Sequence, residues 1–177
     1  MILGLDVSTS ITGVTILDNS GNIIFCEAWD MRNKKHYPTL FHKGQKVKEL
    51  LKQIKKQHNV TSIFIEQSLQ SFRSGFSSAK TLSTLSRFNG IVSWLCYEIF
   101  HLEPGYVAAT SARKKCGITI PKGSKAKQVV MQYVIDNIPG VPITYTKNDN
   151  PKPHCYDMAD SSVVAKAGWL DWQAQQR

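Results

Sequence analysis

Two short apolar runs of this chain each end on a carboxylate. The first covers residues 1–5 and ends at Asp6, and the second covers residues 62–65 and ends at Glu66. Such runs are typical of buried strands, and the helical periodicity between them predicts a crossover that makes the two strands parallel. Because parallel strands end at the same edge of a sheet, we expect Asp6 and Glu66 to lie side by side.

The order of the predicted elements defines the fold class. Residues 1–8, 11–18 and 23–29 are apolar stretches separated by short polar turns, which predicts an antiparallel meander. The later elements are helices over 42–58, 78–100, 125–138 and 157–169, strands near 62–66 and 106–109, and a short basic turn or helix beginning at Ser111. This order predicts an α/β fold of the sandwich kind, in which helices flank a mixed sheet of three antiparallel strands followed by parallel strands.

Length, charge and cysteine content limit the number of domains, the kind of binding partner and the cellular compartment. The 177 residues fit a single domain over 1–177, and the net charge of +9 favours a polyanion such as nucleic acid or an anionic membrane. No apolar run reaches the roughly 18–20 residues of a membrane span, and the first strand begins without a leader segment. The four cysteines form no C-x-x-C pair, which argues against a zinc site and favours a reducing compartment. We therefore expect a cytoplasmic protein.

Two further acids complete a candidate cluster. Asp157 and Asp160 are three residues apart at the start of a predicted helix, so they share one helix face. Taken singly, each acid has a structural interpretation, as a turn, a strand end, a helix N-cap or a first-turn charge. Taken together, buried carboxylates are unfavourable unless a cation or substrate uses them, and their oxygens suit hard divalent cations. Acid clustered inside a basic chain indicates metal chemistry on a polyanion.

Three segments carry a resemblance to a known family. Residues 4–13 (GLDVSTSITG), 65–67 (IEQ) and 157–161 (DMADS) resemble the RuvC-type Holliday junction resolvases of the ribonuclease H-like superfamily. The segments occur in the family's order and at similar spacing, over nearly the whole chain. The compact length resembles a bacteriophage or bacterial member.

This resemblance implies an activity and its cofactor. The implied protein is a homodimer that cuts four-way DNA junctions with Mg²⁺, or Mn²⁺ as a substitute, and leaves 5′-phosphate and 3′-hydroxyl ends, with no nucleotide cofactor. Two ions roughly 3.5–4 Å apart activate water and stabilise the leaving oxygen in such sites. The implied dimer interface is the helix over 78–100. The implied metal ligands are Asp6, Glu66, Asp157 and Asp160.

The resemblance also implies roles for basic side chains. Residues 123–128 resemble a family segment whose lysine contacts the phosphate at the cut, which matches Lys127 best and leaves Lys125 as the alternative. A lysine there neutralises phosphate charge in the transition state. Arg113, Lys114 and Lys115 resemble a second basic element of the family, in which Arg113 and Lys114 are the implied DNA contacts. A solvated helix face remains the alternative for such lysines, and it is our expectation for the lysine-rich face over 43–56.

His154 and the loop after Glu66 supply the last candidates. His154 precedes Asp157 by three residues, so it shares that face if the helix begins early; its implied role is to orient the attacking water or contact the phosphate. The alternative is an ordinary loop histidine. The loop candidates for DNA contact at the junction centre are Phe72, Arg73 and Phe76, with Leu69 as another wedge candidate.

Other functions stay open at this stage. A ribonuclease H acting on RNA–DNA hybrids uses similar acids without needing a dimer. A non-catalytic module that binds branched DNA would not need all four carboxylates. An actin-like kinase or ATPase shares the turn after Asp6, but it requires two such domains and a longer chain.

Overall fold

Five strands form one mixed sheet in the computed structural model, which describes residues 1–67 and 79–176. The strands are β1 (Ile2–Asp6), β2 (Ile11–Leu17), β3 (Ile23–Asp30), β4 (Ser62–Glu66) and β5 (Gly105–Val107). Their order is β3-β2-β1-β4-β5; the first three pair antiparallel, whereas β4 pairs parallel to β1 and to β5. The predicted α/β class and mixed sheet are therefore confirmed.

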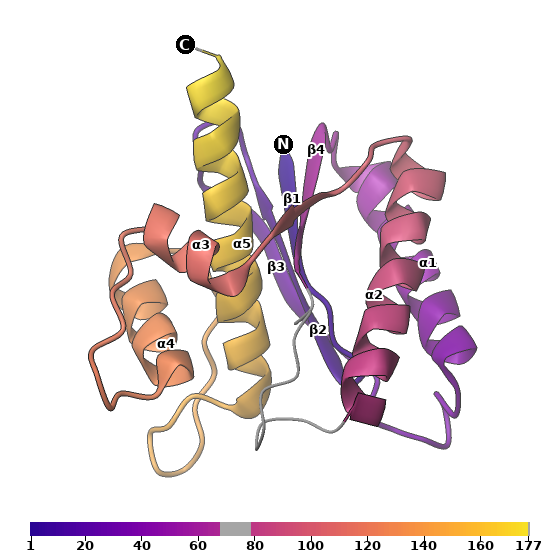
Figure 1. Cartoon of the computed structure of the whole chain (residues 1–177), viewed down its shortest axis with the longest axis horizontal. Helices are drawn as coiled ribbons and strands as arrows, with labels where there is room; N and C mark the ends of the chain where they lie inside the picture. The colour runs from indigo at the N-terminus through magenta and orange to yellow at the C-terminus, as the bar shows by residue number, and fades with distance from the viewer. Residues whose placement is uncertain (68–78, 177) are drawn as a thin grey trace.

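Helices cover both faces of this sheet (Figure 1). One face carries α1 (Leu40–Gln57) and α2 (Ala79–Phe100), and the other carries α5 (Pro153–Gln175) with α3 (Ala109–Lys115) and α4 (Ala126–Asn137) outside it. The first face buries Val47 and Phe88 with the strands, and the second buries Met158 and Val163 of α5 with residues of α3 and α4. The core is thus split between two interfaces with the sheet.

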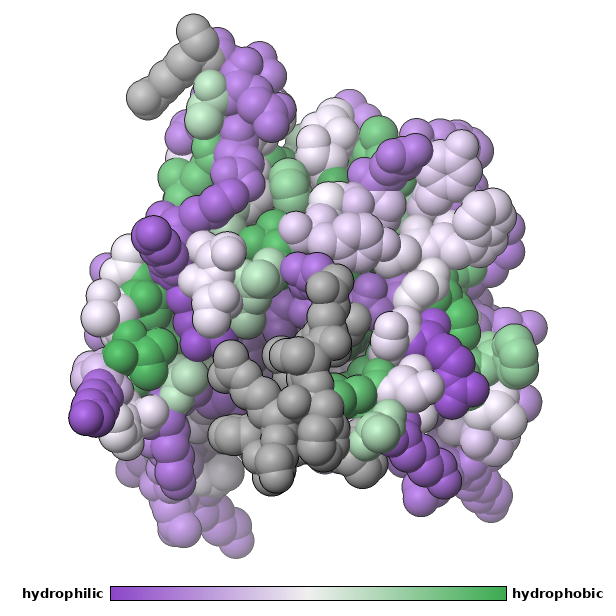
Figure 2. Space-filling view, viewed as in Figure 1, coloured by the Kyte–Doolittle hydropathy of each residue, from purple (hydrophilic) through white to green (hydrophobic). Residues whose placement is uncertain are grey.

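The strand β2 is buried on both faces of the sheet. All seven residues of β2 are buried, including Thr12 and Thr15, as expected for a strand covered by helices on both faces. The edge strand β3 shows mixed burial instead. On the visible face, hydrophobic residues occur in separate groups among hydrophilic ones (Figure 2). No helix in the described part of the chain is long and apolar enough to cross a membrane.

Several predicted boundaries were wrong. The last helix begins at Pro153 rather than Asp157, because proline at the first helical turn needs no hydrogen-bonded N–H and has a helical φ already. The strand predicted over 106–109 ends at Val107, since Ala109 opens α3. Thr39 caps α1 by accepting a hydrogen bond from the His42 N–H, so that helix begins at Leu40.

Candidate active site

The parallel pairing of β1 and β4 brings the first two acids together. Leu5 lies opposite Ile65 in the register, and the next residue on each strand is Asp6 or Glu66. The buried Asn89 of α2 donates its side-chain N–H to the Glu66 carbonyl oxygen at 3.1 Å, which anchors the end of β4. The expected neighbourhood of these two carboxylates is present.

A close contact with β2 brings the other two acids to the same edge. Gly13 pairs with Asp6 across the β1–β2 ladder, and a Cβ on Gly13 would lie 1.9 Å from the Asp157 carbonyl oxygen. Only glycine permits this approach, so α5 lies directly on the sheet there. The hydroxyls of Thr15 and Ser161 share a buried 2.8 Å hydrogen bond that links the same two elements. Asp157 therefore lies next to the end of β1.

One cavity collects all four carboxylates. It has a volume of about 250 Å³ and opens at the edge of the sheet where β1 and β4 end. Lys127, from the start of α4, is the one cation among its lining residues in the described chain. The lining residues are Asp6, Val7, Ser8, Glu66, Gln67, Leu82, Leu85, Lys127, Asp157 and Asp160.

The crowding of these acids changes their titration. Burial, followed by repulsion from the other three carboxylates, raises the pKa of Asp6 well above its ordinary value. Burial and the charge of Asp160 raise the pKa of Glu66 to about 7. Burial is also the main reason why the pKa of Asp160 rises to about 6 and that of Asp157 rises as well. Excess negative charge in a desolvated cavity favours a cation.

Two basic residues oppose this repulsion. The charge of Lys127 lowers the pKa of all four acids, although burial outweighs it, and Arg113 acts in the same direction on Glu66 and Asp160. Arg113 is held by a 3.1 Å hydrogen bond from its Nε to the Ala109 carbonyl. Lys127 lines the cavity with the acids, whereas Arg113 acts on them from α3 outside the lining.

The donor set is suited to a divalent cation. Four carboxylates supply eight oxygens, and hard cations such as Mg²⁺ prefer oxygen ligands. Across the described residues, no three His, Cys, Asp or Glu side chains already stand as a metal-binding group. The cavity brings carboxylates from β1, β4 and α5 to one place.

Other predicted residues lie away from the cavity lining. Lys114 and Lys125 are exposed on α3 and just before α4. His154 is in the first turn of α5, where its Nε2 lies 3.2 Å from the Thr144 hydroxyl, and its charge lowers the pKa of Asp157 slightly against the effect of burial. It is thus near the acids without lining their cavity.

Some residues were missed by sequence reasoning, and some lie beyond the structure. Gln67 lines the cavity directly after Glu66, and Leu82 and Leu85 line it from one face of α2. The sequence predicted that Leu82 and Leu85 share one face of a helix, but not that this face borders the acids. The loop candidates Leu69, Phe72, Arg73 and Phe76 lie outside the described residues.

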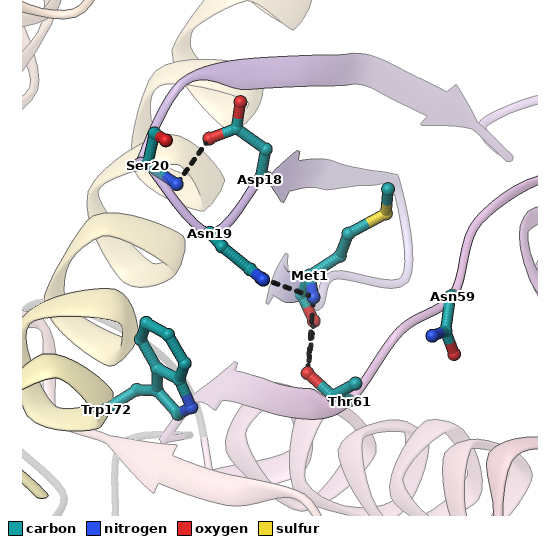
Figure 3. Close-up of a pocket in the computed structure, with 7 residues that line it drawn as sticks. All are labelled: Met1, Asp18, Asn19, Ser20, Asn59, Thr61 and Trp172. Carbon is teal, nitrogen blue, oxygen red and sulfur yellow. Dashed lines mark hydrogen bonds between the residues drawn. The ribbon is translucent and has the colours of Figure 1, made fainter. Parts of the chain in front are cut away.

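A second cavity lies at the opposite end of the sheet (Figure 3). Its volume is about 610 Å³, and Trp172 and the amino group of Met1 line it. The amino group donates to Asn19 Oδ1 and Thr61 Oγ1, each at 3.2 Å. Asp18, the one carboxylate among the described lining residues, accepts hydrogen bonds from its own turn. These groups are satisfied by each other, so the four-acid cavity is the candidate active site.

Comparison with known proteins agrees with this geometry at the level of the fold. Neither a family model nor a curated protein matches the sequence. Among solved structures, Thermus thermophilus RuvC bound to a Holliday junction substrate has a TM-score of 0.68 at 11% identity, covering 98% of this chain and 94% of that chain. Another structure of T. thermophilus RuvC gives 0.65 at 13% identity, with coverage of 98% and 96%.

A eukaryotic structure gives the same result. The yeast mitochondrial Holliday junction resolvase Ydc2 has a TM-score of 0.62 at 16% identity, covering 98% of this chain and 79% of that chain. The similarity thus extends over nearly the full chain, although few residues are shared. The chain has the ribonuclease H-like fold of the RuvC-type Holliday junction resolvases.

Proposed function

We propose that this protein is a metal-dependent endonuclease that resolves four-way DNA junctions. The observation that carries the proposal is the cavity in which Asp6, Glu66, Asp157 and Asp160 meet Lys127. This cavity occurs in a fold shared with Holliday junction resolvases, and the net charge of +9 favours binding to nucleic acid.

The proposed chemistry assigns a role to each side chain. The four carboxylates hold two divalent ions, which when bound activate a water and stabilise the departing 3′ oxygen. Lys127 and Arg113 bind the scissile phosphate and offset the charge that builds up on it. The result is hydrolysis that leaves a 5′-phosphate and a 3′-hydroxyl. Rigid placement on strand ends and on α5 keeps these groups aligned.

A homodimer completes the proposal. A four-way junction is resolved by two opposed nicks, so two symmetric sites suit it. Helix α2 exposes Trp94 and Tyr97, which are 63% and 45% exposed, and their rings lie 5.8 Å apart. Large exposed aromatics on one helix are typical of a protein interface. We assign this surface to the contact with a second copy.

A substrate panel tests the proposal. Purified protein is incubated with end-labelled four-way junction, flap, linear duplex and RNA–DNA hybrid, each with Mg²⁺ or with EDTA. We expect Mg²⁺-dependent, paired nicks in the junction and little cutting of linear duplex. Preferred cutting of the hybrid would replace the junction activity with a ribonuclease H activity. Junction binding without cleavage under any divalent metal would reduce the protein to a binding module.

A further inference from the structure

A groove borders the N-terminal half of α2, on the side of that helix away from the four-acid cavity. Its volume is about 760 Å³, and its walls come from the turn after β1, the segment between β3 and α1, the first turn of α1, and α2. Figure 1 shows that α1 and α2 both begin at the end of the sheet where the acids lie. The lining residues are Thr9, Lys34, Tyr37, Pro38, Thr39, Leu40, Phe41, Lys43, Thr84, Arg87 and Ile91.

The groove is cationic and uncompensated. Lys34, Lys43 and Arg87 line it, and no Asp or Glu does so in the described chain. The three ion pairs found among the described residues lie elsewhere: Arg32–Asp30, Lys48–Glu98 and Lys115–Asp171. None of the three groove cations forms an ion pair with a described residue. Three positive charges around one hollow favour an anionic ligand.

One of these cations is held in place. The Lys43 ammonium donates a hydrogen bond to the Thr9 carbonyl, so its charge is fixed at the wall between β1 and α1. Burial, and then the charge of Lys34, lowers the pKa of Lys43. An anion between these side chains would relieve their repulsion. The aromatic rings of Tyr37 and Phe41 add a wall without charge, and Phe41 is 80% exposed.

The groove is adjacent to the candidate active site. Leu82 and Leu85 of α2 line the acid cavity, whereas Thr84, Arg87 and Ile91 line the groove, so two faces of one helix border the two hollows. Thr9 lies only three residues beyond Asp6. A nucleic-acid strand leaving the acids can therefore reach the groove by crossing one helix turn.

We propose that this groove binds the sugar-phosphate backbone of the strand that leads away from the cut. The inference rests on the proposed nuclease function and adds a substrate-binding surface to it. Lys34 and Arg87 contact phosphate oxygens, and Lys43 contributes fixed positive charge. Tyr37 and Phe41 pack against the sugars. Backbone contacts of this kind position a nucleic acid without reading its sequence.

Two double variants that remove equal charge test the groove. Lys34→Ala/Arg87→Ala removes two groove cations, and Lys52→Ala/Lys56→Ala removes two exposed lysines of α1 that do not line it. Junction affinity is measured in EDTA at several salt concentrations. Losing two phosphate contacts should reduce the slope of log K against log salt by about 2 and weaken binding roughly tenfold or more near 0.1 M salt. The control pair should keep the wild-type slope.

Footprinting adds a positional readout. We expect the Lys34→Ala/Arg87→Ala protein to lose backbone protection on the strand beyond the cut and to keep it at the cut itself. Equal slopes and equal footprints for the two double variants, with both proteins folded by circular dichroism, would overturn the groove proposal and leave the nuclease intact. Absence of junction binding by the wild-type protein would instead overturn the proposed function.

Discussion

Single side chains determine the chemistry of the candidate site. Four carboxylates share a cavity of about 250 Å³ with one lysine, and repulsion between carboxylates adds to the effect of burial in raising the pKa of Asp6, Glu66 and Asp160. Such an arrangement is unfavourable for the resting protein and useful for binding cations. The first predictions therefore concern these residues.

Neutral replacement of the acids should separate cutting from binding. We expect Asp6→Asn, Glu66→Gln and Asp157→Asn each to reduce cleavage by ~10³-fold or more, because each removes the charge of a proposed metal ligand. Junction affinity should stay within a few-fold of wild type. Glu49→Gln, at an exposed position of α1, is the matched control. Cleavage at the wild-type rate by any of the three site variants would contradict the assignment.

The raised pKa of Glu66 predicts a pH-dependent stability. Its ordinary value is 4.5 and its folded value is about 7, so the folded protein gains from the protonated form, and this gain is lost as pH rises from 4.5 through 7. At pH 8 in EDTA, Glu66→Gln should raise the free energy of unfolding by on the order of 2 kcal/mol. Denaturant melts at pH 5 and pH 8 measure this, and the gain should shrink at pH 5. A variant no more stable than wild type at pH 8 would refute it.

Lys127 should matter for the rate more than for affinity. Its charge acts on all four acids, so it lies where a scissile phosphate would bind. Lys127→Ala should slow single-turnover cleavage by ~10²-fold, as expected for loss of one charge-stabilising group. Lys125→Ala, two residues away and exposed, should have a much smaller effect. A loss confined to affinity would make Lys127 a backbone contact only.

At the scale of elements, strand order and helix identity were predictable, but exact starts and rotations were not. Turn residues and apolar runs mark the strands locally. The start of α5 lacks a side-chain cap and a first-turn acid, so Asp157 looked like its natural beginning. In α3, Ala112 is buried while Lys115 pairs with Asp171, and the charge of Arg113 acts on Glu66. Those rotations depend on tertiary packing.

The contact between β2 and α5 yields a prediction at this scale. Gly13→Ala should push the N-terminal part of α5 off the sheet, because the added Cβ meets backbone atoms of Asp157 in the second helical turn. Overpacking of this kind costs about 1–3 kcal/mol, and we expect cleavage to fall at least tenfold at temperatures where the variant is folded. Gly168→Ala overpacks the same helix against Phe64, away from the acids. Equal cleavage losses in both variants would show that stability alone is responsible.

At the scale of the whole molecule, the site was predictable only as a meeting of distant segments. Asp6, Glu66 and Asp157 could be brought together from strand order and helix placement. The contribution of α2 through Leu82 and Leu85 could not, because the direction in which a helix face points is set by the complete fold. The groove beside α2 could not be predicted for the same reason, since its cations come from three separate segments of the chain.

Assembly is tested at the same scale. If α2 forms the contact between two copies, Trp94→Lys should place a charge in that interface and produce monomers. Light scattering coupled to gel filtration should give twice the monomer mass for wild type and the monomer mass for the variant. Ile24→Lys, at an exposed residue of β3, is the control and should remain dimeric. A wild-type protein that is monomeric at all concentrations would contradict the proposed assembly.

Because four acids share one cavity, substitutions that stabilise the metal-free protein there are expected to reduce cleavage. Replacing Glu66 or Asp160 by a neutral residue should relieve repulsion and raise the free energy of unfolding of the metal-free protein. The same change removes a proposed metal ligand. A screen for heat-resistant variants would therefore enrich inactive proteins first. A screen that demands both heat resistance and cleavage should therefore find its stabilising substitutions away from the four-acid cavity.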